Sequence, residues 1–256
     1  MSEIEVNIPV QSAPPATGLT QWQRVLYTFT APSRTFDDIQ QGNRSWWMPF
    51  LLTLLFSALF FVSVQTKVGW DQAANNLLRQ NAKFQERMAQ APPGQLEKTI
   101  QTSATITKFS SYATPITILL MVYLGSLMLL ATINFGFAGK AKVGGVFTVW
   151  MYAGLPGIIK AVLGAAVLFA GAAPESFNFK NFAPTNLAAF LNPADTAPAL
   201  YVLLTSLDVI TIWTMVLLSI GLAKVAGVRR SSGYMAVFGW WALITLASVS
   251  ATLLFN

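Results

Sequence analysis

Two charged side chains lie inside long apolar segments of this 256-residue chain: Lys160 interrupts LPGIIKAVLGA, and Asp208 interrupts LLTSLDVITIW. A charge in the middle of a membrane span costs about 2.5–3.5 kcal/mol on insertion scales, so it normally faces the bundle interior or a water-filled cavity. Counted from the same end of their predicted helices, the two residues lie within about one turn of each other, at about 1.5 Å per residue. We therefore predict that Lys160 and Asp208 form an intramembrane ion pair or share a polar cavity.

Three roles for these charges remain open. A pair that fixes two helices in register is the role we favour, because buried ion pairs contribute more to specificity than to net stability. A proton or ion relay is the second role. In the third, Lys160 extends along its helix to the interface and does not contact Asp208.

Other chemistry is narrowly limited by composition. The chain has no cysteine and no histidine, which excludes disulfides, thiol nucleophiles, imidazole bases and the zinc or haem sites that need those ligands. It has no glycine-rich phosphate loop of the P-loop type. Asp37 and Asp38 are adjacent and near a predicted helix start, which does not suit paired acid and base catalysis. We predict no catalytic residue, no cofactor and no metal site, and hence no enzyme.

Small residues and a proline precede and follow Lys160. Gly157, Ala161 and Ala165 repeat every four positions, which permits close approach of another helix. Ordinary packing within the bundle is favoured over a dimerisation face. Pro156 is expected to kink this helix, because proline removes a backbone hydrogen bond and clashes with the preceding turn.

A basic cluster follows the segment that contains Asp208, and its members are Lys224, Arg229 and Arg230. These residues could bind anionic lipid head groups, each adding about 1 kcal/mol near the surface. A role in fixing topology is the favoured alternative. The formal charge of +6 does not indicate nucleic-acid binding, because the basic residues lie in segments that flank apolar runs.

The elements that position these residues are predicted to be membrane-spanning helices. Residues of the apolar set make up 54% of the chain and charged residues only 10%, and the mean hydropathy is +0.53. Charged residues are about 25% of ordinary soluble domains, so the lipid bilayer is the expected solvent. Segments of about 20 apolar residues can each cross it. We predict an all-α, polytopic bundle with five transmembrane helices, near residues 45–66, 115–136, 143–171, 199–223 and 234–255.

The rest of the chain divides into three regions. Residues 1–18 are predicted to be a disordered tail. Residues 19–45 are predicted to be an amphipathic interfacial segment, whose apolar face contains Trp22, Leu26 and Phe29. The five-span domain then covers residues 46–256. Within it, residues 68–113 are expected to form an extramembrane helical loop, and residues 172–198 an irregular loop lying against the membrane.

Charge distribution predicts the orientation. Eight basic residues fall on the side of the N-terminus in tight clusters near helix ends, and seven fall on the other side, mostly along one long loop. Short basic connections favour the cytoplasm. We therefore expect a cytoplasmic N-terminus.

Several segments carry a family resemblance. Pro32, Phe36 and Ile39 precede a Trp-Trp-x-Pro entry into the first span, YAGLPG begins at Tyr152, and LDVITIWTMVLLSIGLAKVAG runs over residues 207–227. This combination resembles the Yip domain family of Ypt/Rab-interacting membrane proteins, in the form that occurs in bacteria. The matching Trp213 and Gly221 are interpreted as packing positions.

The resemblance implies a multi-pass protein of the bacterial cytoplasmic membrane with no established reaction. Eukaryotic relatives bind Rab GTPases and partner membrane proteins through cytosolic N-terminal regions, but this chain has no Tyr-Gly-Pro type motif in its tail. We predict a non-catalytic interaction or organising component whose partners are the lipid bilayer and other membrane proteins or a second copy. A small transporter or channel that uses Lys160 and Asp208 is the alternative, and a membrane enzyme is third.

Overall fold

The computed structural model describes residues 18–79, 84, 86, 90, 92, 94–192 and 195–255. Five helical segments in this part of the chain are long and apolar enough to cross a membrane, which confirms the predicted all-helical, five-span class. They are α3 (Trp47–Lys67), α7 (Thr114–Gly136), α8 with α9 (Val143–Ala153 and Gly157–Phe169), α11 (Val209–Ala226) and α12 (Arg230–Phe255). The predicted tail, residues 1–18, lies outside the described residues except for Gly18.

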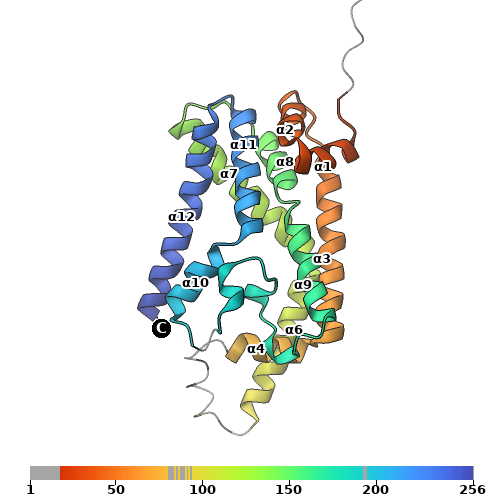
Figure 1. Cartoon of the computed structure of the whole chain (residues 1–256), viewed down its shortest axis with the longest axis vertical. Coiled ribbons are helices and arrows are strands. Elements are labelled where there is room, and N and C mark those ends of the chain that lie inside the picture. Colours follow the sequence, from red (N-terminus) through yellow and green to blue (C-terminus); the bar gives the residue numbers. More distant parts are fainter. Residues whose placement is uncertain are drawn as a thin grey trace, which may run out of the picture.

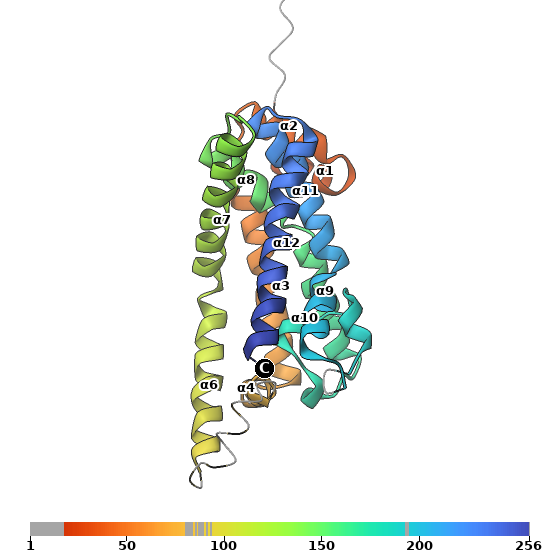
Figure 2. The ribbon, with the colours of Figure 1, turned by 90° about the vertical axis from the view of Figure 1, so that its left-hand side faces the viewer.

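The spans run alternately up and down between two different ends (Figure 1). At the cap end, two short helices, α1 (Gln21–Thr30) and α2 (Pro32–Gln40), cover the start of α8 and the end of α11. At the loop end, α4 (Trp70–Arg79) packs against α6 (Gln95–Tyr112). Figure 2 shows α6 and α7 running nearly in line along one side of the molecule and past the loop end. The predicted loop at residues 68–113 therefore contains α4 and α6.

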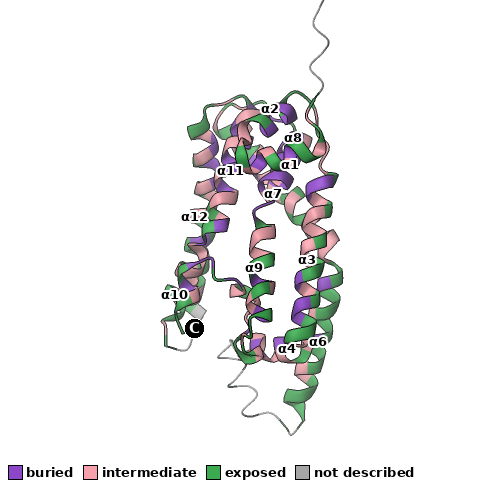
Figure 3. Ribbon diagram, turned by 45° about the vertical axis from the view of Figure 1, so that its right-hand side comes forward, coloured by how far each residue is buried: buried purple, intermediate pink, exposed green. Residues whose placement is uncertain are grey.

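The main apolar core lies at the cap end (Figure 3). Half of the residues of α11 are buried, whereas only 11% of an 18-residue apolar stretch of α12 is buried. α11 is therefore the central helix, and α12 is peripheral. On the outer side of α3, Leu51, Leu55 and Leu59 are exposed at intervals of four residues. This spacing places them on one helix face, where lipid is the expected neighbour. Burial within the protein is thus concentrated on the faces that meet α11 and the cap.

The fourth span differs from its prediction as one continuous helix over residues 199–223. A short helix, α10 (Pro198–Ser206), ends before Asp208, and α11 begins after it. Asp208 is the N-cap of α11, because its Oδ1 accepts a hydrogen bond from the Thr211 backbone N–H at 2.8 Å. Aspartate is a preferred N-cap residue, since its carboxylate pairs with an otherwise unpaired amide of the first turn. Asp208 therefore starts a helix and does not lie within one.

The third span is also broken. α8 ends at Ala153 and α9 begins at Gly157, so the break contains Gly154 and Pro156. Pro156 is the N-cap residue of α9. The break changes the direction of the chain between the cap-end and loop-end halves of this span (Figure 1).

The connection from α9 to α10 is irregular between short turns, and parts of it pack into the bundle. It contains three 3-10 turns, η1 (Pro174–Ser176), η2 (Phe179–Asn181) and η3 (Leu187–Phe190). Phe177 and Phe182 pack with Phe60 of α3 in a second apolar cluster. The Val209 N–H also donates to the Thr185 carbonyl at 2.9 Å. The connection therefore folds back into the bundle as far as the break at Asp208.

α1 leaves part of its predicted apolar face exposed and buries two polar residues. Arg24 and Thr28 are buried, whereas Trp22 is 64% exposed and Leu26 57% exposed. Phe29 does pack against the core, edge to face with Trp213 at a centroid distance of 5.7 Å. The polar side chains turn inward because they find hydrogen-bond partners beneath the helix, as described below.

Candidate functional site

The predicted polar pair lies at the two breaks of the bundle. Lys160 Nζ, on α9, is 3.0 Å from Asp208 Oδ2, at the start of α11. Asp208 is only 1% exposed, and the Lys160 side chain is 23% exposed. The structure thus places the two residues in direct contact across α9 and α11.

Asp208 has protein partners on both carboxylate oxygens. Thr185 Oγ1 donates to Oδ2 at 2.5 Å, in addition to the Lys160 ammonium on the same oxygen. The Thr211 amide donates to Oδ1. We call Lys160, Thr185, Asp208 and Thr211 the Asp208 cluster. It joins α9, α11 and the folded-back connection at a single carboxylate.

Aromatic rings pack closely against one side of the Asp208 cluster. The Lys160 ammonium lies 5.6 Å from the centroid of the Phe182 ring. A Cβ added at Gly164, one turn further along α9, would meet the rings of Phe182 and Phe60. Three surface hollows lie along α4 and α6, away from Asp208. This arrangement suits a structural junction better than a path for ions.

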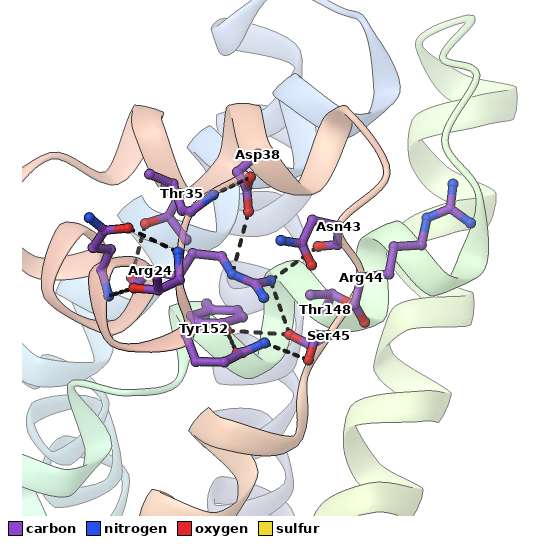
Figure 4. Close-up of polar contacts among 12 residues, drawn as sticks. Arg24, Thr35, Asp38, Asn43, Arg44, Ser45, Thr148 and Tyr152 are labelled. Atoms are coloured by element: carbon purple, nitrogen blue, oxygen red, sulfur yellow. Dashed lines mark hydrogen bonds and ion pairs between the residues drawn. The ribbon is translucent and has the colours of Figure 1, made fainter. Parts of the chain in front are cut away.

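A second buried polar cluster at the cap end was not predicted (Figure 4). Arg24 is 1% exposed, and its Nη1 donates to the carbonyl oxygens of Asn43 and Ser45, both at 3.1 Å. Its Nε lies 3.4 Å from Asp38 Oδ2. The other oxygen of Asp38 accepts from the Leu19 backbone N–H at 3.0 Å. Arg24 and Asp38 therefore hold α1, α2 and the segment before α3 together.

Tyr152 connects this cluster to the membrane domain. Its hydroxyl donates to Gln21 Oε1 at 2.9 Å, and the Ser45 carbonyl lies 3.3 Å away. The Arg24 guanidinium carbon is 5.3 Å from the Tyr152 ring centroid, within the range of a cation–π contact. We call Gln21, Arg24, Asp38, Ser45 and Tyr152 the cap cluster.

The underside of the cap is apolar and tightly fitted. Phe36 of α2 is fully buried against α8 and α11. A Cβ added at Gly221 of α11 would meet the Phe36 ring and the Val149 side chain. Only glycine permits this approach of α2 to α11. Phe36 and Gly221, which belong to the segments that carry the family resemblance, thus meet at one interface.

A signal for the cap cluster was present in the spacing of polar residues. Arg24 and Thr28 are four apart on α1, and Thr35 and Asp38 are three apart on α2. Such pairs lie on one face of a helix. The Thr28 and Thr35 hydroxyls both donate to the Arg24 carbonyl, at 2.8 and 3.0 Å. Two short helices with facing polar stripes indicate a buried polar contact, which the stronger apolar pattern of α1 obscured.

The predicted small-residue stripe of α9 is only partly in contact with other helices. Gly157 is exposed, and a Cβ there would meet nothing within 4 Å. Ala161 and Ala165 pack beside the Phe60 cluster. The close approach of α9 to its neighbours is made at Gly164, which the four-residue repeat does not include.

The predicted basic cluster divides into two parts. Lys224 forms an ion pair with Asp37 of α2. Arg229 and Arg230 are exposed, and Arg230 Nη2 lies 3.4 Å from Ser33 Oγ. Only Lys224 is therefore neutralised by a carboxylate of the cap.

Comparison with known proteins gives one match. A family model described as Yip1 domain matches residues 26–251, nearly the whole chain, and confirms the resemblance noted from the sequence. No curated protein and no solved structure matches the chain significantly.

Proposed function

The chain belongs to the Yip1 domain family, and on this premise we propose that it acts as a non-catalytic interaction or organising component of the membrane. The observation that carries the proposal is the state of Asp208. Its two oxygens accept hydrogen bonds from Lys160, Thr185 and Thr211, and the residue is 1% exposed. A buried carboxylate whose two oxygens both accept hydrogen bonds from protein groups on different segments is suited to joining those segments.

The exposure of the peripheral helices supports a role in interaction. Within the 18-residue apolar stretches of α7 and α12, only 17% and 11% of the residues are buried inside the protein. Large apolar side chains such as Ile116 and Leu246 are exposed on these two helices. Association of helices in lipid is driven by van der Waals packing, hydrogen bonds and lipid entropy, and these two helices have the most surface left for such packing. We propose that partner membrane proteins, or a second copy, contact α7 and α12.

We further propose that the protein lies in the cell membrane with its cap end in the cytoplasm. The short connections that join the spans at the cap end contain Lys140, Lys142 and Arg229, and Arg230 is the first residue of α12. Positive charge in short connections is typical of the cytoplasmic side.

The test is photo-crosslinking in native membranes. A photoreactive residue is placed at Ile116 on α7 or Leu246 on α12, and at Leu55 on the exposed face of α3 as the matched control. The tagged protein is purified and its adducts are identified by mass spectrometry. We expect a reproducible protein adduct from α7 or α12 and weaker adducts from α3. Lipid adducts alone at all three positions would contradict the proposal.

Asp208→Asn separates this function from transport. Asparagine keeps an oxygen that can accept from the Thr211 amide but removes the charge. An organising protein should retain its crosslinked partner in this variant. A chain that retains its partner but loses ion-dependent growth or flux would be assigned to transport instead.

A further inference from the structure

Within the described part of the chain, the excess of positive charge lies at the cap end. Among the described residues, eight basic and two acidic residues lie at or near this end, whereas the loop end has five of each. The two acids of the cap end, Asp37 and Asp38, are each paired, with Lys224 and Arg24 respectively. Six exposed cations are left without an acidic partner in the described part of the chain, and these are Arg34, Arg44, Lys140, Lys142, Arg229 and Arg230.

Contacts between segments bring these cations onto one surface. Arg230 reaches Ser33 of α2, next to Arg34. The Lys140 amide donates to the Ala226 carbonyl at 2.9 Å, which ties the connection before α8 to the end of α11. A Cβ added at Gly144 would lie 3.4 Å from Arg44 Cδ, so Arg44 lies beside the start of α8. The six residues therefore surround the cap end.

The depth of these cations matches the head-group layer of a bilayer. Arg44 lies three residues before the start of α3, Lys142 directly before α8, and Arg229 directly before α12. Trp22 and Trp47 are exposed at the same end, and exposed tryptophan is typical of the membrane interface. The cations therefore lie along the rim of the bundle, where the spans begin or end.

We propose that this surface, which we call the basic rim, binds the head groups of anionic phospholipids. Fixing the topology requires only positive charge on one side. The pairing of both local acids leaves the other cations free to bind an anion. Each such cation near a membrane surface contributes about a fivefold gain in affinity, equivalent to about 1 kcal/mol.

The test compares lipid retention by the purified full chain in mild detergent, measured by native mass spectrometry. The probes are phosphatidylglycerol and phosphatidylcholine. We expect the wild-type chain to retain more phosphatidylglycerol than phosphatidylcholine. Arg229→Gln/Arg230→Gln should lower its retention at least fivefold and leave phosphatidylcholine unchanged. The matched control is Lys98→Gln/Lys108→Gln, which removes two exposed cations from the loop end and should have no effect.

Two further measurements keep the outcome decisive. If Arg229→Gln/Arg230→Gln fails to fold, Lys140→Gln/Lys142→Gln tests the same rim. Inorganic phosphate at millimolar concentration should not displace the bound lipid. Equal retention of the two lipids by the wild-type chain, an equal loss in the loop-end control, or displacement by free phosphate would each overturn the proposal.

Discussion

Arg24 is the residue on which the position of the cap depends most directly. Its guanidinium pairs with Asp38 and with two carbonyl oxygens, and the side chain has almost no access to solvent. A buried ion pair adds little net stability, but removal of one member leaves the other charge buried and unpaired. Replacing Arg24 is therefore expected to lower the free energy of unfolding by more than the ion pair contributes to it.

We predict that Arg24→Met destabilises the protein by about 3–5 kcal/mol. Thermal unfolding in detergent, followed by tryptophan fluorescence, measures the change, and limited proteolysis reports whether the cap opens first. Arg229→Met is the control, because Arg229 is exposed and surface substitutions change stability by about 0.5 kcal/mol or less. Equal melting temperatures for the two variants would show that the cap cluster has no structural role.

In the Asp208 cluster, removal of Lys160 and removal of the Asp208 charge are expected to destabilise the protein to different extents. Asp208 is buried, whereas the Lys160 side chain is 23% exposed and can extend toward a polar environment. Lys160→Met should therefore destabilise the protein more than Asp208→Asn, which also keeps the N-cap oxygen. The double variant Lys160→Met/Asp208→Asn should recover part of the loss. The melting temperatures of the three variants measure the coupling between the two side chains, and strictly additive shifts would contradict pairing.

At the scale of elements, the fit of α2 against α11 depends on Gly221. We predict that Gly221→Ala destabilises the protein by about 1–3 kcal/mol, because the added methyl group would meet Phe36 and Val149 in a packed core. Gly239→Ala in α12 is the matched control, since nothing lies within 4 Å of a Cβ there. That control should be neutral or stabilising by up to about 1 kcal/mol, because alanine favours helix. Both changes are read from thermal unfolding, and a neutral Gly221→Ala would show that α2 can shift.

The elements also show how far the sequence can predict this fold. Runs of about 20 apolar residues identified all five spans, since spanning length and hydropathy are properties of a single segment. The Lys160 and Asp208 pair could be proposed from depth along two helices. The break at Asp208 could not be predicted from the sequence. The start of α11 depends on the N-cap hydrogen bond and on Thr185, which comes from a connection with no regular pattern. The cap cluster likewise required knowledge of how α1 and α2 face each other.

For the whole molecule, the difference in charge between the two ends predicts the side of the membrane that each end occupies. The chain contains no cysteine, so one introduced thiol is the only target for a maleimide. We predict that Gln101→Cys at the loop end is labelled by a membrane-impermeant maleimide in intact cells. Ser231→Cys at the cap end should be labelled only after permeabilisation. The reverse pattern would place the cap end outside.

The separation of Lys160 and Asp208 has a consequence for biosynthesis. The two residues are 48 positions apart in the chain, and synthesis proceeds at about 5–20 residues per second. Lys160 thus leaves the ribosome about 2–10 s before its partner. During that interval the cost of an unpaired charge in the bilayer, about 2.5–3.5 kcal/mol, opposes entry of α9. The third span is therefore expected to remain beside the insertion machinery until the fourth arrives, so that these two spans enter the lipid together.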